Sequence, residues 1–379
     1  MVILNLKMDN VLAFNDFEIN FSYPKKLSKT LIPNENLFTK TSFRYKKVNI
    51  FVGSNATGKT SLIKCIWTIL LFLNKREQNI IEGIINKNGK NAYIMMDYAE
   101  DNNDSSRLKR VIVKYDNNEL KMAYNELSIR EGDSYESRVK DFDNLDFTLT
   151  DSIECFKSME QYSGWNVVLP ATEKGFDVVK FVGLNNESEE KEYFNILNQV
   201  LKTLDPSIIN VSKSLDASNA IVVKHENANI IIIQEGNSLS SINYLSSGTK
   251  YGINLANVLF SIKYHKNGIY LIDEQFSYVN SDIEASILST MVSMLGDNEQ
   301  IFFTTHNGNI LDLGFPFHSF NFMKKVNENG KQKIVSSCAS EVENRSNVSP
   351  KTIMDNDMLG TAPNVNRIFE IGEVVKSKY

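Results

Sequence analysis

The sequence has little cysteine. Three residues, Cys65, Cys155 and Cys338, lie far apart in a chain of 379 residues. An odd number of widely spaced cysteines without a Cys-x-x-Cys pair excludes a disulfide framework and argues against a zinc site. Reduced, buried thiols are typical of proteins of the cytoplasm. We therefore expect a cytoplasmic protein.

Long hydrophobic runs are also missing. The longest apolar stretch, "CIWTILLFL", has about nine residues, whereas a membrane-spanning helix needs about 20. The first residues, "MVILNLKMDN", lack the basic and apolar segments of a signal peptide. Sustained heptads and internal repeats are absent, which excludes long coiled-coil arms. We expect a soluble protein without a membrane partner.

The sequence has no excess of positive charge. Its net charge is −5 and its isoelectric point is about 5.6, so binding to nucleic acid would need a local basic stripe. Apolar residues make up 42% of the chain, which is ordinary for a globular protein. The length suits one large domain or two intimate ones.

The pattern of apolar residues predicts an α/β fold. Residues 1–52 alternate like strands, and "GKTSLIKCIWTILLFLNK" follows as a helix. From about residue 245 onward helices alternate with strands such as "GIYLID" and "QIFFTTH", which predicts a largely parallel sheet. We interpret residues 1–75 and 241–379 as one discontinuous domain. Residues 76–240, which are richer in charge, Asn and Ser, are interpreted as an inserted lobe that recognises a partner.

The segment "GSNATGKT" has the spacing of a phosphate-binding loop, Gly-x-x-x-x-Gly-Lys-Thr, between a strand and a helix. Glycines let backbone N–H groups turn toward phosphate oxygens, and the positive N-terminal end of the helix adds to the attraction. Lys59 would bind the β- and γ-phosphates of ATP, and Thr60 would ligate Mg²⁺. The residues expected around the phosphates are Gly53, Ser54, Asn55, Ala56, Thr57, Gly58, Lys59, Thr60 and Ser61.

A second acidic motif completes such a site. The apolar run "IYLI" leads into Asp273 and Glu274. A carboxylate at the end of a buried strand would place Asp273 beside the Mg²⁺, and Glu274 could accept a proton from the attacking water. The alternative is a strand that merely ends in acidic residues at the surface.

Two further motifs have both a functional and a structural interpretation. "LSSGTK" opens a helix, and its Ser246, Ser247 and Gly248 could form a second phosphate site that serves another subunit; the alternative is an ordinary helix cap. His306 follows the strand "QIFFTT" and could contact the γ-phosphate or the water, or be structural.

Together and in this order, the four motifs resemble those of ABC-class ATPase heads, most closely the SMC, RecF and OLD-like branch. The resemblance covers roughly residues 1–75 and 240–315. It implies a P-loop NTPase fold of ABC type: a mixed, mostly parallel sheet with an N-terminal antiparallel β part and an inserted α/β lobe. More narrowly, "SSGTK", "TTHNGNILDL" and "IMDNDMLGTAPNVNRIFEI" are similar to stand-alone AAA-type proteins of bacterial anti-phage defence, among them the ATPase subunit of PARIS-type systems.

The resemblance implies roles for single residues. Lys59, Thr60, Asp273, Glu274 and His306 take the family roles, and Ser246 with Gly248 would act in trans on a partner's γ-phosphate. The sequence departs from the family pattern at Ser247 and Thr249. Asn280 and Asp282 are candidates for cross-subunit contacts, and Gln161 or Gln199 for the family's glutamine loop.

The main functional hypothesis is an ATP-hydrolysing switch that forms a homodimer or higher oligomer around ATP. Few residues follow His318, too few for the nuclease domain of OLD-type proteins, and the Asp-x-Asp of "MDNDM" is interpreted as a loop. A separate nuclease or toxin would therefore be the effector. A DNA-maintenance ATPase that binds duplex DNA is the alternative; its candidate basic runs are Arg44–Lys47 and Arg107–Arg110. A subunit of a membrane transporter is a third, less favoured hypothesis.

Overall fold

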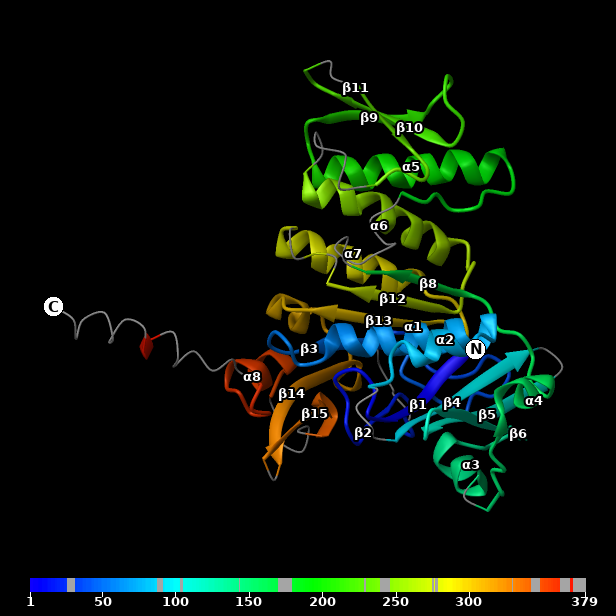
Figure 1. Ribbon diagram of the computed structural model, residues 1–379. Coiled ribbons are helices and arrows are strands. Elements are labelled where there is room, and N and C mark those ends of the chain that lie inside the picture. Colours follow the sequence, from blue (N-terminus) through cyan, green and yellow to red (C-terminus); the bar gives the residue numbers. More distant parts are fainter. Residues whose placement is uncertain are drawn as a thin grey trace.

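The computed structural model describes most of the chain (Figure 1). The described residues are 1–25, 31–86, 91–102, 105–142, 144–169, 179–227, 230–238, 246–274, 276, 279–328, 330–341, 348–361 and 369–370. The boundary expected at residues 240–241, Leu245 of "LSSGTK" and much of the tail motif lie outside this part of the chain.

A six-stranded sheet forms the centre of the molecule. Its strand order is β15-β14-β3-β13-β12-β8, and all neighbours are parallel except the β14–β15 hairpin. Every residue of β3, β12 and β13 is buried, as expected for parallel strands that are covered on both faces. The strands are β3 (Val48–Val52), β8 (Trp165–Val168), β12 (Ile269–Asp273), β13 (Gln300–Thr305), β14 (Phe320–Glu328) and β15 (Lys331–Cys338).

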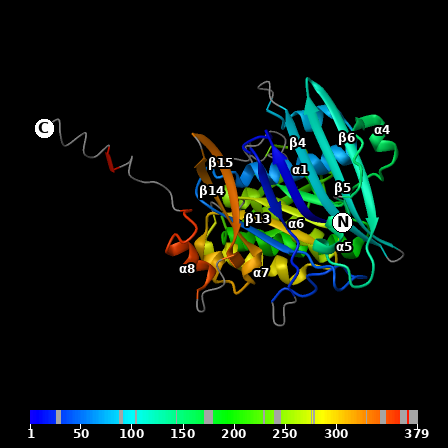
Figure 2. The same cartoon turned by 90° about the horizontal axis from the view of Figure 1, so that it is seen from below.

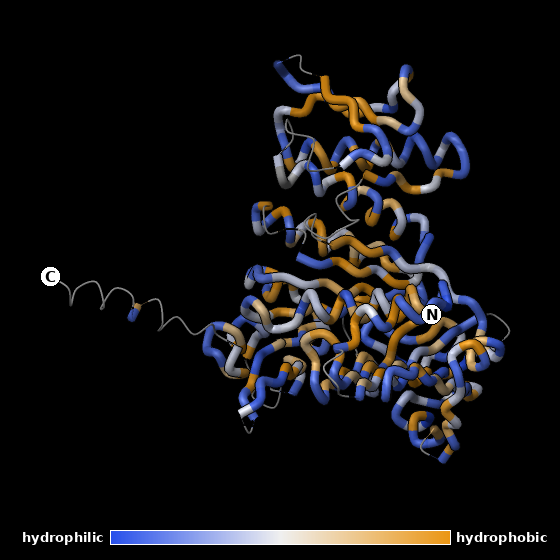
Figure 3. The backbone as a smooth tube through the Cα atoms, viewed as in Figure 1, coloured by the Kyte–Doolittle hydropathy of each residue, from blue (hydrophilic) through white to orange (hydrophobic). Residues whose placement is uncertain are grey.

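Helices cover the two faces of this central sheet differently. Helices α6 (Ser247–Lys263) and α7 (Ser281–Met294) pack on one face, together with the side chains of Val48, Ile50 and Val52. Helix α1 (Lys59–Lys75) packs on the other face and separates it from a second sheet (Figure 1). Hydrophobic residues are concentrated in the central strands between these layers (Figure 3).

The second sheet is antiparallel and has the order β2-β1-β4-β5-β6-β7. Its long strands β4, β5 and β6 lie side by side in the view from below (Figure 2). The strands are β1 (Val2–Asp9), β2 (Phe17–Asn20), β4 (Ala92–Asn102), β5 (Ser105–Asp116), β6 (Glu119–Ser128) and β7 (Thr150–Asp151). The expected antiparallel N-terminal part is therefore present, and it is larger than residues 1–75 alone.

Strand pairing divides the range 76–240 differently from the single lobe that the sequence suggested. Strands β4–β6 pair onto β1, and β8 pairs with β12 at the edge of the central sheet, so both belong to the head. Within the described part of this range, helix α5 (Glu187–Leu204) and the sheet β11-β10-β9 stand apart, beyond α6 (Figure 1). These three strands are β9 (Ile208–Lys213), β10 (Ala220–His225) and β11 (Ile230–Gln234).

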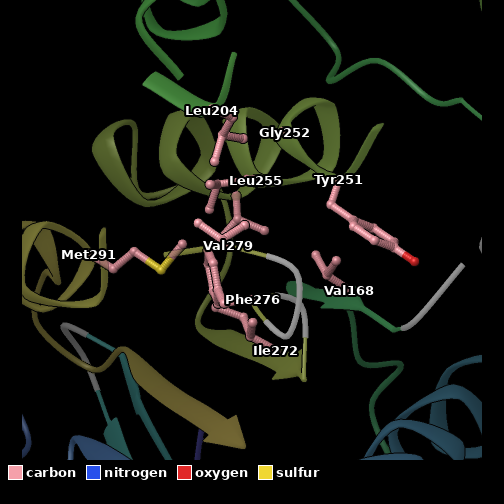
Figure 4. A pocket seen from close by; sticks show the side chains of 10 residues that line it. Val168, Leu204, Tyr251, Gly252, Leu255, Ile272, Phe276, Val279 and Met291 are labelled. Carbon is pink, nitrogen blue, oxygen red and sulfur yellow. The ribbon is translucent and has the colours of Figure 1, made fainter. Parts of the chain in front are cut away.

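Helix α5 packs closely on α6. A side chain at Gly252 would come within 2.6 Å of Leu201 and 2.8 Å of Leu204, so only glycine fits this crossing without displacing a neighbour. On its other side, α6 meets β12 and α7 across a small apolar cavity (Figure 4). The cavity is lined by Val168, Leu204, Tyr251, Gly252, Leu255, Val258, Ile272, Phe276, Val279 and Met291.

The remaining elements are short. They are helices α2 (Gln78–Glu82), α3 (Tyr135–Phe142), α4 (Ser152–Lys157) and α8 (Pro350–Asp355), and the 3-10 turns η2 (Gly308–Asp312), η3 (Phe317–Ser319) and η4 (Ala339–Glu341). All three cysteines are buried and free, as expected. In the described part of the chain, no helix combines the length and the apolar character needed to cross a bilayer.

A buried ion pair joins β4 to β5. Asp97 has no exposed surface and accepts two hydrogen bonds from the guanidinium of Arg110, each 2.7 Å long. The hydroxyl of Tyr135 donates a third hydrogen bond of 2.6 Å to the same carboxylate. Because Asp97 carries the charge that faces the buried guanidinium, its removal would take away this counter-charge.

We predict that Asp97→Ala lowers the free energy of unfolding by about 3–5 kcal/mol, which is typical of one partner removed from a buried ion pair. Urea unfolding measures this change. Glu154→Gln, which breaks an exposed pair with Lys157, is the control and should cost less than about 0.5 kcal/mol. Equal effects of the two substitutions would contradict the structural role of Asp97.

Candidate active site

The phosphate-binding loop runs from the end of β3 to the start of α1. Gly58 is the N-cap of α1 with φ 94°, a left-handed conformation that favours glycine, and a side chain there would come within 2.6 Å of Ile334. A side chain at Gly53 would collide with the backbone oxygen of Met323. Asn55 and Ala56 are exposed at the tip of the loop. The loop thus has the shape that a phosphate cradle requires, with the N–H groups of the first turn of α1 at its base.

Lys59 lies at the centre of the loop. Its side chain is 2% exposed, and Nζ donates hydrogen bonds to the carbonyl oxygens of Gly53 (2.8 Å) and Ser54 (3.1 Å). The same nitrogen lies 3.5 Å from Oε1 of Glu274. Burial lowers the pKa of Lys59, and the charge of Glu274 opposes this shift. The ammonium group is thus held inside the cradle by partners that a phosphate could replace.

Asp273 and Thr60 come together from two different elements. Asp273 ends β12 without exposed surface, and Thr304 Oγ1 donates a 2.6 Å hydrogen bond to its Oδ1. Burial raises the pKa of Asp273, while hydrogen bonds with Thr304 and Thr60 act in the opposite direction. A hydroxyl and a carboxylate are hard oxygen ligands of the kind that Mg²⁺ prefers. Their chemistry therefore fits the expected metal site.

Glu274 and His306 face each other beside Lys59. His306 Nε2 donates a hydrogen bond of 2.8 Å to Glu274 Oε1, and its Nδ1 lies 3.5 Å from Lys59 Nζ. The hydrogen bond from His306 is the main cause that lowers the pKa of Glu274, so this carboxyl is ionised near neutral pH. Its backbone has φ 43°, an uncommon conformation for a non-glycine residue. The N–H of Glu274 is fixed by Thr304 Oγ1 at 3.0 Å.

The Ser-Ser-Gly motif lies at the start of α6. Ser246 is exposed and is the N-cap of the helix: its Oγ accepts a hydrogen bond of 3.1 Å from the N–H of Thr249. Gly248 follows in the first turn. Among the described residues, no hydrogen bond or ion pair connects Ser246 to the phosphate loop of the same chain.

The two glutamines suggested for a glutamine loop lie elsewhere. Gln161 donates to the carbonyl of Asn74 at the far end of α1, about 20 Å along the helix from the phosphate loop. Gln199 is exposed on α5, beyond α6. Neither side chain contacts the site in the described part of the chain. Asn280 caps α7 by accepting a hydrogen bond from the N–H of Asp282.

Burial removes four of the six basic residues in the two basic runs from the surface, whereas Arg44 and Arg107 are partly exposed. Lys46, Lys47, Lys109 and Arg110 are all buried, and Lys109 and Arg110 form ion pairs with acidic residues of the antiparallel sheet. These side chains therefore stabilise the head and are not available to phosphates of DNA. This burial could not be predicted from the sequence. A short basic run looks the same whether its side chains are buried in a sheet or face the solvent.

Sequence reasoning missed four residues around the site. They are Glu284, Thr304, Thr305 and Asn307, which hold the acidic pair and the histidine in place. The consecutive polar residues "TTHN" at the end of a buried strand were a usable signal, because buried hydroxyls need partners. Glu284 had no local signal.

No protein-family model matches the chain, and no curated protein matches it. Solved structures do. A crystal structure of an SMC head bound to the C-winged helix domain of ScpA aligns with a TM-score of 0.52 and 14% identity over 91% of this chain and 100% of that chain.

Two further SMC heads align less well. One is from Thermotoga maritima (TM-score 0.43, 17% identity, 89% of this chain and 99% of that one). The other derives from Pyrococcus furiosus, carries an extended coiled coil and is bound to the C-terminal domain of ScpA (0.49, 12%, 90% and 98%). The alignment with the first of the three structures, whose TM-score is 0.52, confirms the expected fold class: a P-loop NTPase fold of the ABC type.

The raised pKa of Asp273 predicts how it affects stability. The folded state binds the carboxyl proton of Asp273 more tightly than the unfolded state does. The contribution of Asp273 to stability therefore falls as the pH rises above about 3.8, the ordinary pKa of an aspartate. At neutral pH the buried charge is a cost. We predict that Asp273→Asn raises the free energy of unfolding by about 1 kcal/mol near pH 7.5, without nucleotide or Mg²⁺, and that the gain shrinks toward pH 4.

Urea unfolding at several pH values measures this effect. Asp116→Asn, at an exposed strand end, is the matched control and should change little. A loss of stability in Asp273→Asn near pH 7.5 would contradict the account of Asp273 as a costly buried charge.

Proposed function

We propose that the chain binds ATP and Mg²⁺ and hydrolyses the nucleotide. The observation that carries this proposal is the convergence of Lys59, Glu274 and His306 on the phosphate loop, within 3.5 Å of one another. The neighbouring pair Thr60 and Asp273 adds the oxygen ligands that a nucleotide-bound Mg²⁺ needs. These residues come from three separate parts of the sequence, and a structural role alone would not require their mutual contact.

Each residue has a chemical role in this reaction. Lys59 would exchange the carbonyls of Gly53 and Ser54 for phosphate oxygens, which also releases it from Glu274. Glu274, ionised because of its lowered pKa, would accept a proton from the attacking water. His306 would keep the carboxylate oriented through Nε2–H. Bound Mg²⁺ would neutralise charge on the phosphates, held by Thr60 and Asp273.

We infer that the complete site needs a second copy of the chain. Ser246 is an exposed residue that caps α6, and within the described residues it makes no contact with its own phosphate loop. A partner's phosphate loop is therefore the site that Ser246 and Gly248 would complete in trans. Two such sites would form in a homodimer around two ATP molecules.

The biological role that fits best is a nucleotide switch which controls a separate effector, a nuclease or toxin, in bacterial anti-phage defence. The resemblance of the short tail motifs to PARIS-type ATPase subunits supports this role. In the Asp-x-Asp of the tail, Asp355 ends the short helix α8 and Asp357 lies in a turn. Neither acid follows a strand, as the metal-binding acids of a nuclease domain would.

We predict that Lys59→Ala lowers ATP affinity at least about tenfold, because the cradle loses the buried ammonium group that would bind the phosphates. Glu274→Gln should keep ATP affinity and lose turnover at least about 100-fold, the usual contribution of a general base. Nucleotide-binding titrations and phosphate-release assays measure the two effects.

Two exposed substitutions are the controls: Lys75→Ala at the end of α1 and Glu187→Gln at the start of α5. Both should behave like the wild-type protein. Normal turnover in Glu274→Gln would overturn the role of Glu274, and wild-type affinity in Lys59→Ala would overturn the nucleotide site itself.

A further inference from the structure

A buried acid on α7 holds the chain on both sides of His306. Glu284 lies in the first turn of α7 and is 5% exposed. Its Oε1 accepts a hydrogen bond of 2.7 Å from Thr305 Oγ1, and its Oε2 accepts one of 2.8 Å from Asn307 Nδ2. The two donors are the residues immediately before and after His306.

Further hydrogen bonds tie the same segment to α7. The N–H of Asn307 donates to Thr305 Oγ1 at 2.9 Å, and Asn307 Nδ2 also reaches the carbonyl of Ser281 at 3.3 Å. Asn309 Nδ2 lies 3.3 Å from Ser281 Oγ. Helix α7 therefore holds the backbone around His306, while the imidazole ring faces Glu274 and Lys59.

Burial raises the pKa of Glu284, so this acid is costly at its position. An apolar residue of similar volume would avoid the cost of a buried charge, but it could not accept the hydrogen bonds from Thr305 and Asn307. Polar networks of this kind fix one arrangement when every member has a partner. The network thus selects one orientation for the residue that it encloses, His306.

We propose that Glu284 is the positioning residue of His306: it holds Thr305 and Asn307 so that the imidazole Nε2 meets Glu274 Oε1 at hydrogen-bonding distance. This inference rests on the proposed ATP hydrolysis for its effect on turnover, but not for its effect on the histidine. Glu284 itself touches neither Glu274 nor Lys59 in any described contact. It acts through the histidine segment alone.

The chemistry of the network predicts a graded response. Glu284→Gln keeps one acceptor oxygen for Asn307 and presents an amide N–H₂ to Thr305, whose oxygen has capacity to accept it. Glu284→Ala removes both acceptors. We expect Glu284→Gln to retain most of the wild-type behaviour and Glu284→Ala to lose it.

The kinetic test places Glu284→Ala in the wild-type and in the His306→Ala background. If Glu284 acts only through His306, the single variant loses kcat to about the same extent as His306→Ala, with KM within about threefold of wild type. In the His306→Ala background the second substitution then adds less than about a twofold loss. A full additional loss in the double variant, or wild-type kcat in Glu284→Ala, would overturn the proposal.

A second measurement does not depend on activity. The chain has four histidines, so the imidazole signals of a histidine-labelled sample can be resolved by NMR, and His306→Ala assigns the relevant one. Glu284→Ala should shift the His306 signal and leave those of His225, His265 and His318 in place. Thr290→Ala, on the exposed side of α7, is the control and should shift none of them.

The two measurements separate the possible failures. An unmoved His306 signal in Glu284→Ala would overturn the positioning role. Absence of turnover in the wild-type protein, together with a shifted His306 signal, would overturn the proposed ATPase function and leave the positioning role intact. If Glu284→Ala moves all four signals, the substitution has disrupted the fold, and Glu284→Gln then decides: an unmoved His306 signal with unchanged kcat would again overturn the proposal.

Discussion

The parallel register of three strands is the constraint on which the whole site depends. In the central sheet Thr305 of β13 pairs with Val52 of β3, and Thr304 pairs with Asp273 of β12. The phosphate loop follows Val52, His306 follows Thr305, and Asp273 is itself the last residue of β12. Because parallel strands end at the same edge of a sheet, three segments separated by about 200 and 30 residues of sequence arrive together. A shift of one strand by one residue would turn Asp273 to the opposite face.

The site that results is rich in buried charge, and this has a cost in stability. Burial lowers the pKa of Lys59 and raises those of Asp273 and Glu284. Among these acids Glu274, half-buried and hydrogen-bonded by His306, differs, because its pKa is lowered. Ionisation is therefore disfavoured at Lys59 and Asp273, where a phosphate and a cation would supply the counter-charge. It is favoured at Glu274, where a base is needed. The buried charge of Asp273 lowers the stability of the fold, and a bound cation would offset this cost.

The sequence predicted the parts of the site that are defined by local pattern. The spacing from Gly53 to Thr60, the apolar run before Asp273 and the strand before His306 each report on their own backbone conformation, and the structure brings these residues together. What could not be predicted depends on long-range pairing: that β4–β6 extend the N-terminal sheet, that β8 joins the central one, and that Arg110 is buried against Asp97. Glu284 belongs to this group, since its partners lie about 20 residues further along the chain.

If each complete site is shared by two chains, mixing two inactive variants should restore activity. Lys59→Ala disables the phosphate loop of a chain, and Ser246→Arg blocks the start of its α6, so each variant alone should be inactive. In a dimer of one Lys59→Ala and one Ser246→Arg chain, the intact loop of the second meets the intact helix start of the first. The account predicts that an equal mixture recovers about a quarter of the wild-type ATPase activity, because half of the dimers are mixed and each has one intact site of two. Full activity of Ser246→Arg alone, or no recovery in the mixture, would contradict it.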